Sequence, residues 1–453
     1  MPYDLQQRRA GVLLHPTSFP SGTLRDAAPW LDFLDATGLS VWQVLPLGIP
    51  QDNHSPYQCL SAFAANPRLL DDASPLEPDH EEFHAYCTAQ DHWLEDYALF
   101  RQIKHLYNGL SWVQWPEALK WRDTEALHAI GKQHAGALLE LKWEQYQLHC
   151  RWQQIRKDAH RRKLALFGDM PIFVAHDSAD VWACPQRFLL DDDGQPTWVA
   201  GVPPDYFSET GQRWGNPHYD WQRHKQENFE WWVARMQNHF EWFDLVRIDH
   251  FRGLQAVWMI DAEAETAEKG HWQEVPGDEL LATLRERLGS LPLVAEDLGI
   301  ITPEVRALKE KYHLPGMAIL QFSFDHFEDN PNKPQNIGPN TVVYTGTHDN
   351  DTTLGWFRSL DAPMQAHVLS VLGIREEKEV APAMIRTAMQ SRANLAMVPL
   401  QDFLSLGSEA RMNVPGVAEG NWRWKFHWEQ LSAPERIEWI RQQVSDSQRE
   451  VKA

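Results

Sequence analysis

A chain of 453 residues is long enough for roughly two to four domains, or for one large barrel with insertions. Its 42 Lys and Arg against 63 Asp and Glu residues give a formal net charge of −21, which repels nucleic acids and acidic membrane surfaces. A hydrophobic content of 43% is that of a globular protein and excludes a disordered or fibrous chain.

Eight short apolar runs alternate with segments of helical character, an order typical of a parallel sheet covered by helices. They lie at 11–15, 41–47, 164–169, 243–249, 293–297, 317–322, 342–345 and 395–400. Capping and charge signals predict helices over 278–288, with Gly289 as a left-handed cap, and over 302–311. Eight strand–helix units predict an α/β fold of the (β/α)8 barrel type.

Two insertions account for the length beyond the barrel, which by itself takes about 250 residues. Residues 65–161, rich in helix formers, are expected to form a helical subdomain between the second and third strands. Residues 182–240 begin with a Pro-, Gly- and Asp-rich stretch that is too long for an ordinary connection. We expect this segment to be a lid. With the two insertions, residues 1–453 are expected to form a single (β/α)8 catalytic domain.

The cysteines indicate the compartment. Cys59, Cys87, Cys150 and Cys184 lie far apart without a CxxC pair, which is typical of reduced thiols. No window of 18 apolar residues exists, and the N-terminal apolar run is too short for a signal peptide. We expect a cytoplasmic protein without membrane or nucleic-acid partners. The patterns predict no particular oligomeric state.

Three acidic residues stand at the ends of predicted strands, where the active site of such a barrel lies. Asp249 ends VRID, Glu296 ends LVAE, and Asp349 follows VVYTGTH. Paired carboxylates suit glycosidic chemistry, in which one attacks the sugar carbon and the other protonates the leaving oxygen. Arg247 lies two residues before Asp249, so both side chains share a strand face and the guanidinium favours the charged carboxylate. To hold a proton near neutral pH and act as the acid, Glu296 would need a raised pKa.

A rival motif, His80–Glu81–Glu82–Phe83–His84, matches the H-E-x-x-H zinc signature. Its flanks are acidic and lack the apolar helix that would bury such a site, so we favour a solvated helix start after Pro78. No glycine-rich nucleotide motif occurs. We therefore expect neither a metal nor a cofactor.

Long motifs give the chain a resemblance to a known family. They include RRAGVLLHPTS, SPYQ, GDMPIFVAHDSADVWA, AGVPPDYFSETGQRWGNP, VRIDHFRGL, VAEDLG, YTGTHDNDTTLGWF and PLQDFLSLGSEARMNVPG. The chain resembles the amylomaltases, 4-α-glucanotransferases of glycoside hydrolase family 77 in the α-amylase clan. Two departures are a shorter loop after HPTS, where SGTLRDAAPW replaces a GIGDLG-type turn, and a short chain overall.

The resemblance implies the catalytic roles. Asp249 corresponds to the family's nucleophile, Glu296 to its general acid/base, and Asp349 to its transition-state-stabilising aspartate. It also implies that Arg247 orients the nucleophile and that His348 forms hydrogen bonds with sugar hydroxyls.

Further residues are implied to bind the glucan. Tyr57 would stack on the sugar that becomes bonded to the enzyme, and Asp169 would support the same sugar or serve as a buried structural acid. Asn413 aligns with a position near the sugar. The lid segment 201–217 would offer the ring platforms Tyr206, Phe207 and Trp214.

The resemblance therefore implies a retaining transfer of α-1,4-glucan segments between maltooligosaccharides, without added cofactor. Two alternatives stay open: a plain α-glucan hydrolase that uses the same acids with water, and a catalytically silent glucan-binding protein. Product analysis separates transfer from hydrolysis, and sugar binding without turnover would favour the silent protein.

Overall fold

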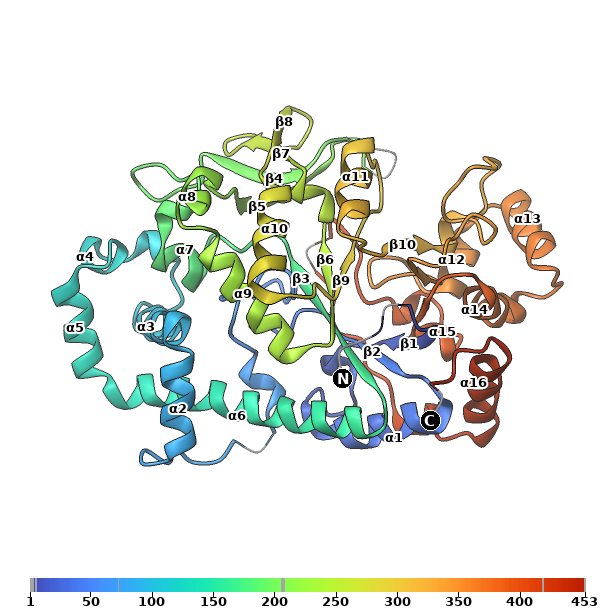
Figure 1. The fold of residues 1–453 in the computed structure, drawn as a ribbon, viewed down its shortest axis with the longest axis horizontal. Helices are drawn as coiled ribbons and strands as arrows, with labels where there is room; N and C mark the ends of the chain where they lie inside the picture. Colours follow the sequence, from blue (N-terminus) through green and yellow to red (C-terminus); the bar gives the residue numbers. More distant parts are fainter. Residues whose placement is uncertain (1–3, 5, 72, 205–207, 418, 452–453) are drawn as a thin grey trace.

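Eight parallel strands form a (β/α)8 barrel in the computed structural model, which describes residues 4, 6–71, 73–204, 208–417 and 419–451 (Figure 1). The strands are β1 (Arg9–Leu13), β2 (Val41–Gln43), β3 (Ala165–Pro171), β6 (Leu245–Asp249), β9 (Leu293–Ala295), β10 (Gly316–Ile319), β11 (Thr341–Tyr344) and β12 (Leu395–Pro399). They pair in the order β10-β11-β12-β1-β2-β3-β6-β9. The end strands meet where Ala295 N–H donates to the Pro315 carbonyl at 2.8 Å. All eight predicted strands are confirmed.

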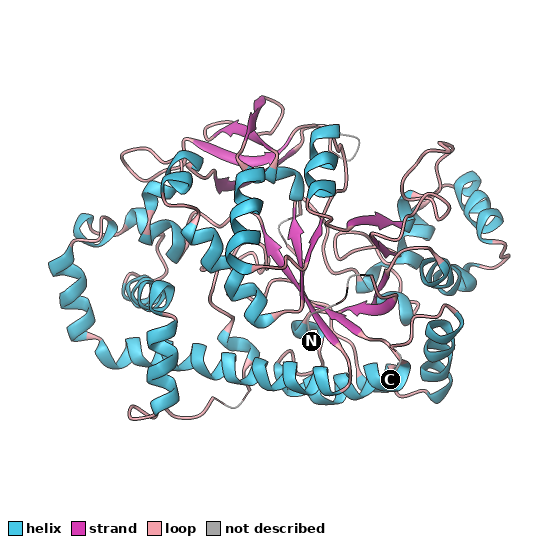
Figure 2. Ribbon diagram, in the orientation of Figure 1, coloured by secondary structure: helices cyan, strands magenta, loops and turns pink. Residues whose placement is uncertain are grey.

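Helices surround these strands, as Figure 2 shows. They are α1 (Ala27–Thr37), α6 (Ala135–Arg161), α9 (Glu230–Trp242), α10 (Gly277–Leu288), α11 (Pro303–Lys311), α12 (Thr353–Ser359), α13 (Ala362–Leu372), α14 (Val380–Gln390), α15 (Leu400–Phe403) and α16 (Pro434–Asp446). The helices predicted over 278–288 and 302–311 are confirmed. Gly289 has the expected positive φ of +80°, but its ψ of −107° lies outside the left-handed helical region, so that cap prediction is wrong in detail.

One of the eight expected helices is absent from its place. Residues 320–340, which connect β10 to β11 and are all described, contain only the short 3-10 helix Leu320–Phe322. Three prolines interrupt this segment, and asparagine side chains hold it together instead. The Asn330 side chain donates to the Phe322 carbonyl at 2.7 Å, and Asn332 Oδ1 accepts from Ile319 N–H at 2.9 Å. The expectation of eight strand–helix units is therefore wrong for this connection.

Alternate strand residues fill the barrel interior, as strand periodicity requires. The apolar interior consists of Val41, Ala165, Phe167, Leu245, Val294, Met317, Ile319, Val342, Tyr344, Leu395 and Met397. Two residues further along β3 and β6, the same inward series reaches Asp169 and Arg247, which lie opposite each other in register. The barrel thus has an apolar floor and a polar layer at the carboxyl ends of its strands.

The interval 65–161 is largely helical. It contains α2 (Glu81–Ala89), α3 (Asp91–Leu106), α4 (Glu117–Lys120), α5 (Thr124–Gln133) and α6. The H-E-x-x-H motif lies at the start of α2, where His80 is the N-cap and its Nδ1 accepts from Phe83 N–H at 3.2 Å. The predicted helix start after Pro78 is confirmed. In the described part of the chain, no three His, Cys, Asp or Glu side chains form a group that could hold a metal ion.

A small antiparallel sheet stands above the barrel, beside α11 (Figure 1). It pairs β4 (Trp198–Val202) and β5 (Gln212–Pro217) with β7 (Ala256–Asp261) and β8 (Gly270–Glu274), in the order β5-β4-β7-β8. The ends of the expected lid 201–217 are thus strands rather than loop. Strand β4 also pairs with β7, which follows β6, so this pairing is a contact distant in sequence.

The interval 182–240 also contains helical structure. Helices α7 (Ala179–Ala183) and α8 (Trp221–Gln226) lie at or within its bounds. It includes most of α9, which packs on β3 and β6. The expected division into a helical subdomain and a lid subdomain stays a prediction.

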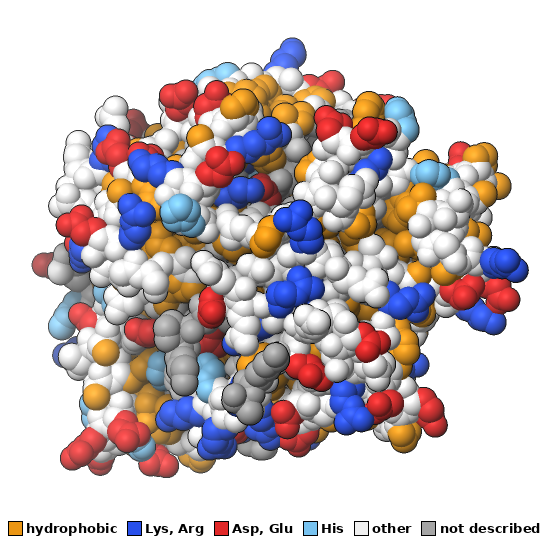
Figure 3. Space-filling model, turned by 45° about the vertical axis from the view of Figure 1, so that its right-hand side comes forward, with side chains coloured by type: hydrophobic (Ala, Val, Ile, Leu, Met, Phe, Trp, Pro, Cys, Tyr) orange, Lys and Arg blue, Asp and Glu red, His pale blue; other side chains and the backbone are white. Residues whose placement is uncertain are grey.

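The surface carries charges of both signs. On the face in Figure 3, acidic and basic side chains are interspersed with neutral and apolar atoms. Cys59, Cys87, Cys150 and Cys184 are all free thiols. Within the described ranges, no helix has both the length and the apolar character needed to cross a membrane.

Candidate active site

A buried arginine joins two aspartates at the ends of β3 and β6. One Arg247 nitrogen, Nη1, donates to both Asp169 oxygens at 2.9 and 2.7 Å, and Nη2 donates to Asp249 Oδ1 at 2.7 Å. Burial acts to lower the pKa of Arg247, but Asp169 and Asp249 outweigh it and raise that pKa well above its ordinary value. The Asp169 side chain is 0% exposed, whereas that of Asp249 is 29% exposed. Of the two aspartates that Arg247 joins, only Asp249 is therefore open to a ligand.

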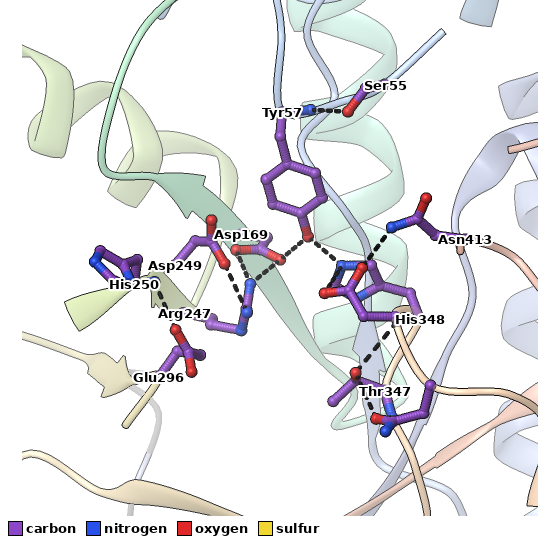
Figure 4. Close-up of polar contacts among 12 residues, drawn as sticks. Ser55, Tyr57, Asp169, Arg247, Asp249, His250, Glu296, Thr347, His348 and Asn413 are labelled. Carbon is purple, nitrogen blue, oxygen red and sulfur yellow. Dashed lines mark hydrogen bonds and ion pairs between the residues drawn. The ribbon is translucent and has the colours of Figure 1, made fainter. Parts of the chain in front are cut away.

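Tyr57 connects this cluster to the opposite side of the site (Figure 4). Its hydroxyl donates to Asp169 Oδ2 at 2.8 Å and lies 2.8 Å from His348 Nε2. Because the hydroxyl proton is directed at Asp169, His348 Nε2 is the donor in the second bond. The Tyr57 and His348 rings stack at 5.3 Å with an angle of 13°. The tyrosine is thereby held in one orientation.

Glu296 follows β9 and is fixed through backbone groups. Its Oε2 accepts from His250 N–H at 2.8 Å, and its Oε1 accepts from Leu298 N–H at 2.9 Å. Burial raises the pKa of Glu296 to about 7, with a further increase from Asp249 and an opposing effect from Arg247. The carboxyl can therefore hold a proton near neutral pH. The pKa of Glu296 is thus raised, as a role as an acid requires.

Asp349 lies in the loop 345–352 between β11 and α12. Its side chain is 43% exposed, its Oδ2 lies 3.3 Å from His348 Nε2, and its Oδ1 accepts from Asn413 Nδ2 at 2.6 Å. Arg411 fixes the backbone on both sides of this contact. It donates to the Asp349 carbonyl and to the Asn413 carbonyl, both at 2.7 Å. An exposed acid is thus held by the segment that follows β12.

The predicted ring platforms are only partly described. Trp214 lies on β5, and its ring meets the His250 ring at 4.9 Å and 87°. This contact places Trp214 beside the residue that follows Asp249. Tyr206 and Phe207 lie outside the described residues.

The structure brings together the predicted residues Tyr57, Asp169, Arg247, Asp249, Glu296, His348, Asp349 and Asn413 through the contacts above. Sequence reasoning did not identify His250 or Arg411. His250 has a φ of +54°, uncommon for a residue other than glycine, and this conformation directs its N–H to Glu296. Arg411 lies inside the motif PLQDFLSLGSEARMNVPG, but only the fold reveals its contact with Asp349.

The arrangement suits displacement at a carbon that carries an oxygen leaving group. Asp249 supplies an accessible carboxylate whose negative charge Arg247 stabilises, and Glu296 supplies a carboxyl that retains a proton. These are the two groups that such a displacement needs, a nucleophile and an acid.

Comparison with known proteins gives consistent matches. A family model described as 4-alpha-glucanotransferase matches residues 12–76 and 72–431. A 4-alpha-glucanotransferase of Synechocystis sp. is 44% identical, over 94% of this chain and 95% of its own. One of Thermus thermophilus is 44% identical, over 92% and 95%. The solved structure of the amylomaltase from Streptococcus agalactiae in complex with acarbose has a TM-score of 0.93 at 32% identity, over 98% of this chain and 100% of that one.

Proposed function

We propose roles for the residues of this site from one premise: the chain belongs to the 4-alpha-glucanotransferase family, glycoside hydrolase family 77, and is a 4-alpha-glucanotransferase of the amylomaltase type. The observation that carries the roles is the difference between the two strand-borne acids. Arg247 stabilises the charge of Asp249, while burial raises the pKa of Glu296 to about 7.

In the first half of the reaction, Asp249 attacks the anomeric carbon of an α-1,4-linked glucan. The bond from that carbon to the glycosidic oxygen breaks, and Glu296 gives its proton to the leaving 4-hydroxyl. A covalent glucosyl ester forms on Asp249, and Glu296 is left as a carboxylate.

In the second half, a second glucan takes the place of the leaving chain. The Glu296 carboxylate accepts the proton of its 4-hydroxyl as the oxygen attacks the ester carbon, and Asp249 is released. The double inversion restores an α-1,4 bond on a new chain. Transfer is favoured over hydrolysis where water is excluded from the site. We assign that exclusion to the lid segment 201–217 and its Trp214.

The other residues hold the sugar and the nucleophile. Asp349 stabilises the transition state at the sugar beside Asp249, and Asn413 holds its carboxylate. His348 forms hydrogen bonds with sugar hydroxyls, and the Tyr57 ring stacks on the same sugar. Asp169 is fully buried, so we infer that it acts by holding Tyr57 and Arg247.

The substrates that fit this chemistry are maltooligosaccharides and longer α-1,4-glucans, as donors and acceptors. A cytoplasmic location agrees with the four free thiols, because thiols persist where the compartment is reducing.

Incubation of the purified protein with maltotriose, without metal or nucleotide, tests the proposal. We expect glucose and a ladder of longer maltodextrins with an unchanged total of reducing ends. A rise in reducing ends without longer products would indicate a hydrolase. Binding without any change in the maltotriose would indicate a silent glucan-binding protein.

A further inference from the structure

One buried carboxylate ties both ends of the loop that carries Asp349. Asp402 lies on α15, directly after β12, and is 1% exposed. The loop 345–352 belongs to another part of the chain, between β11 and α12. The two segments meet through hydrogen bonds that the Asp402 carboxylate accepts at both ends of the loop.

The first contact is at the start of the loop. Thr345 follows the last residue of β11, and its hydroxyl donates to Asp402 Oδ2 at 2.5 Å. Thr345 is itself fully buried. This bond therefore fixes the direction in which the chain leaves the barrel strand.

The second set of contacts is at the end of the loop. Thr353, the first residue of α12, donates its backbone N–H to Asp402 Oδ1 and its hydroxyl to Oδ2, both at 2.7 Å. A single carboxylate thus receives three hydrogen bonds from residues eight positions apart in sequence, and His348 and Asp349 lie between them.

No cation in the described structure forms an ion pair with Asp402. Its burial raises the pKa of the carboxyl, and the hydrogen bonds of Thr345 and Thr353 oppose that shift. A buried carboxylate without a cation is costly unless such bonds satisfy it. A neutral apolar side chain could fill the same space, but it could not hold two separate chain segments by directed bonds.

Resting on the role proposed above for Asp349, we propose that Asp402 is a positioning residue for the transfer reaction. It sets the span of the loop 345–352 and so the placement of the Asp349 carboxylate toward the reacting sugar. It does not touch the substrate. Arg411 and Asn413 also hold Asp349, through its backbone carbonyl and its carboxylate.

Asp402→Asn tests the assignment, because the amide keeps the size of the carboxylate but has only one acceptor oxygen, so it cannot accept from both the Thr353 N–H and the two threonine hydroxyls as the carboxylate does. With maltotriose as substrate, we expect kcat to fall about tenfold to a hundredfold while KM changes less than about twofold. Thr345→Val removes one hydroxyl and keeps the shape. It should show the same pattern with a smaller loss, and it serves as the test if Asp402→Asn does not fold.

A matched control is Asp244→Asn at the amino end of β6. Asp244 is also a buried aspartate, which accepts from Arg156 at 2.8 Å and from Leu166 N–H at 2.9 Å, but it lies away from the site. This variant should lose thermal stability and retain the kcat of its folded fraction. An unchanged kcat in Asp402→Asn, or an equal fall of kcat in both variants, would overturn the proposal.

The decisive measurement is a double-mutant cycle with Asp349→Asn, using an activated maltosyl fluoride donor so that residual turnover is measurable. Because Asp402 acts through Asp349, Asp402→Asn should cost less than about twofold more in the Asp349→Asn background. Losses that multiply would overturn the positioning role alone. A fully active Asp349→Asn enzyme would instead overturn the role of Asp349 and this inference with it.

Discussion

The two sides of the site are built differently. On one side, Arg247, Asp249 and Glu296 stand on or directly after barrel strands, and the acids are fixed by the adjacent guanidinium or by neighbouring backbone N–H groups. On the other side, His348 and Asp349 stand in a loop, and side chains from beyond β12 hold that loop. Figure 4 shows Asp249 and Glu296 on one side and His348 and Asn413 on the other.

The difference shows what fixes the positions of the side chains on each side of the site. Strand register places Asp169 opposite Arg247 and leaves little freedom to either side chain. The loop has no such register, so its geometry depends on contacts from residues about fifty to sixty positions away in the chain. We expect substitutions on the strand side to remove the chemistry, and substitutions of the residues that hold Asp349 in its loop to weaken it in steps.

Asp249→Ala should give the largest effect. Removal of the nucleophile is expected to lower kcat/KM by about 10⁴-fold or more without loss of the fold. Maltotriose turnover and the melting temperature measure the two properties. A variant with substantial activity would reject the assignment of the nucleophile.

Arg247→Lys should follow. A lysine is a single point charge and cannot bridge two carboxylates as the planar guanidinium does. We expect a loss of about 10²-fold in kcat, together with lower stability because Asp169 is fully buried. Near-normal kcat would mean that the bridge does not orient Asp249.

The pH dependence tests the strand side through Glu296. The raised pKa means that the folded protein keeps this proton up to about pH 7, so the acid form is present below that value and is lost above it. We expect kcat/KM to fall about tenfold per pH unit on the alkaline side, with an apparent pKa near 7 that belongs to the coupled carboxyl pair. A flat profile from pH 6 to 9 would exclude Glu296 as the acid.

Asn413→Ala should give the smallest effect. It removes one amide bond to Asp349 and leaves Arg411 in place, so a loss of about fivefold in kcat is expected. The alkaline limb of its pH profile should stay where it is in the unaltered enzyme, because Asn413 does not contact Glu296. A shifted limb would show that the two sides are not independent.

Sequence periodicity predicted the strand side and the place of Asp349 after its strand, the family resemblance implied His348 and Asn413, and neither identified Arg411. The alternation in VRID places Arg247 and Asp249 on one face, which is a local property of the chain. The pairing of β4 with β7 and the hold of Arg411 on Asp349 depend on contacts distant in sequence. The connection after β10 depends on asparagine side-chain hydrogen bonds, which have no helical or strand periodicity. The backbone of His250 was equally hidden, since a left-handed histidine has no reliable pattern in sequence.

Trapping of the covalent intermediate tests the central claim most directly. Glu296→Gln lacks the base for the second step. Incubation with an α-maltosyl fluoride donor, whose fluoride needs no acid to leave, should therefore accumulate the maltosyl ester. We predict that mass spectrometry of peptides will find the added sugar on Asp249. An adduct on another residue, or fluoride release at wild-type rate without any adduct, would contradict the mechanism.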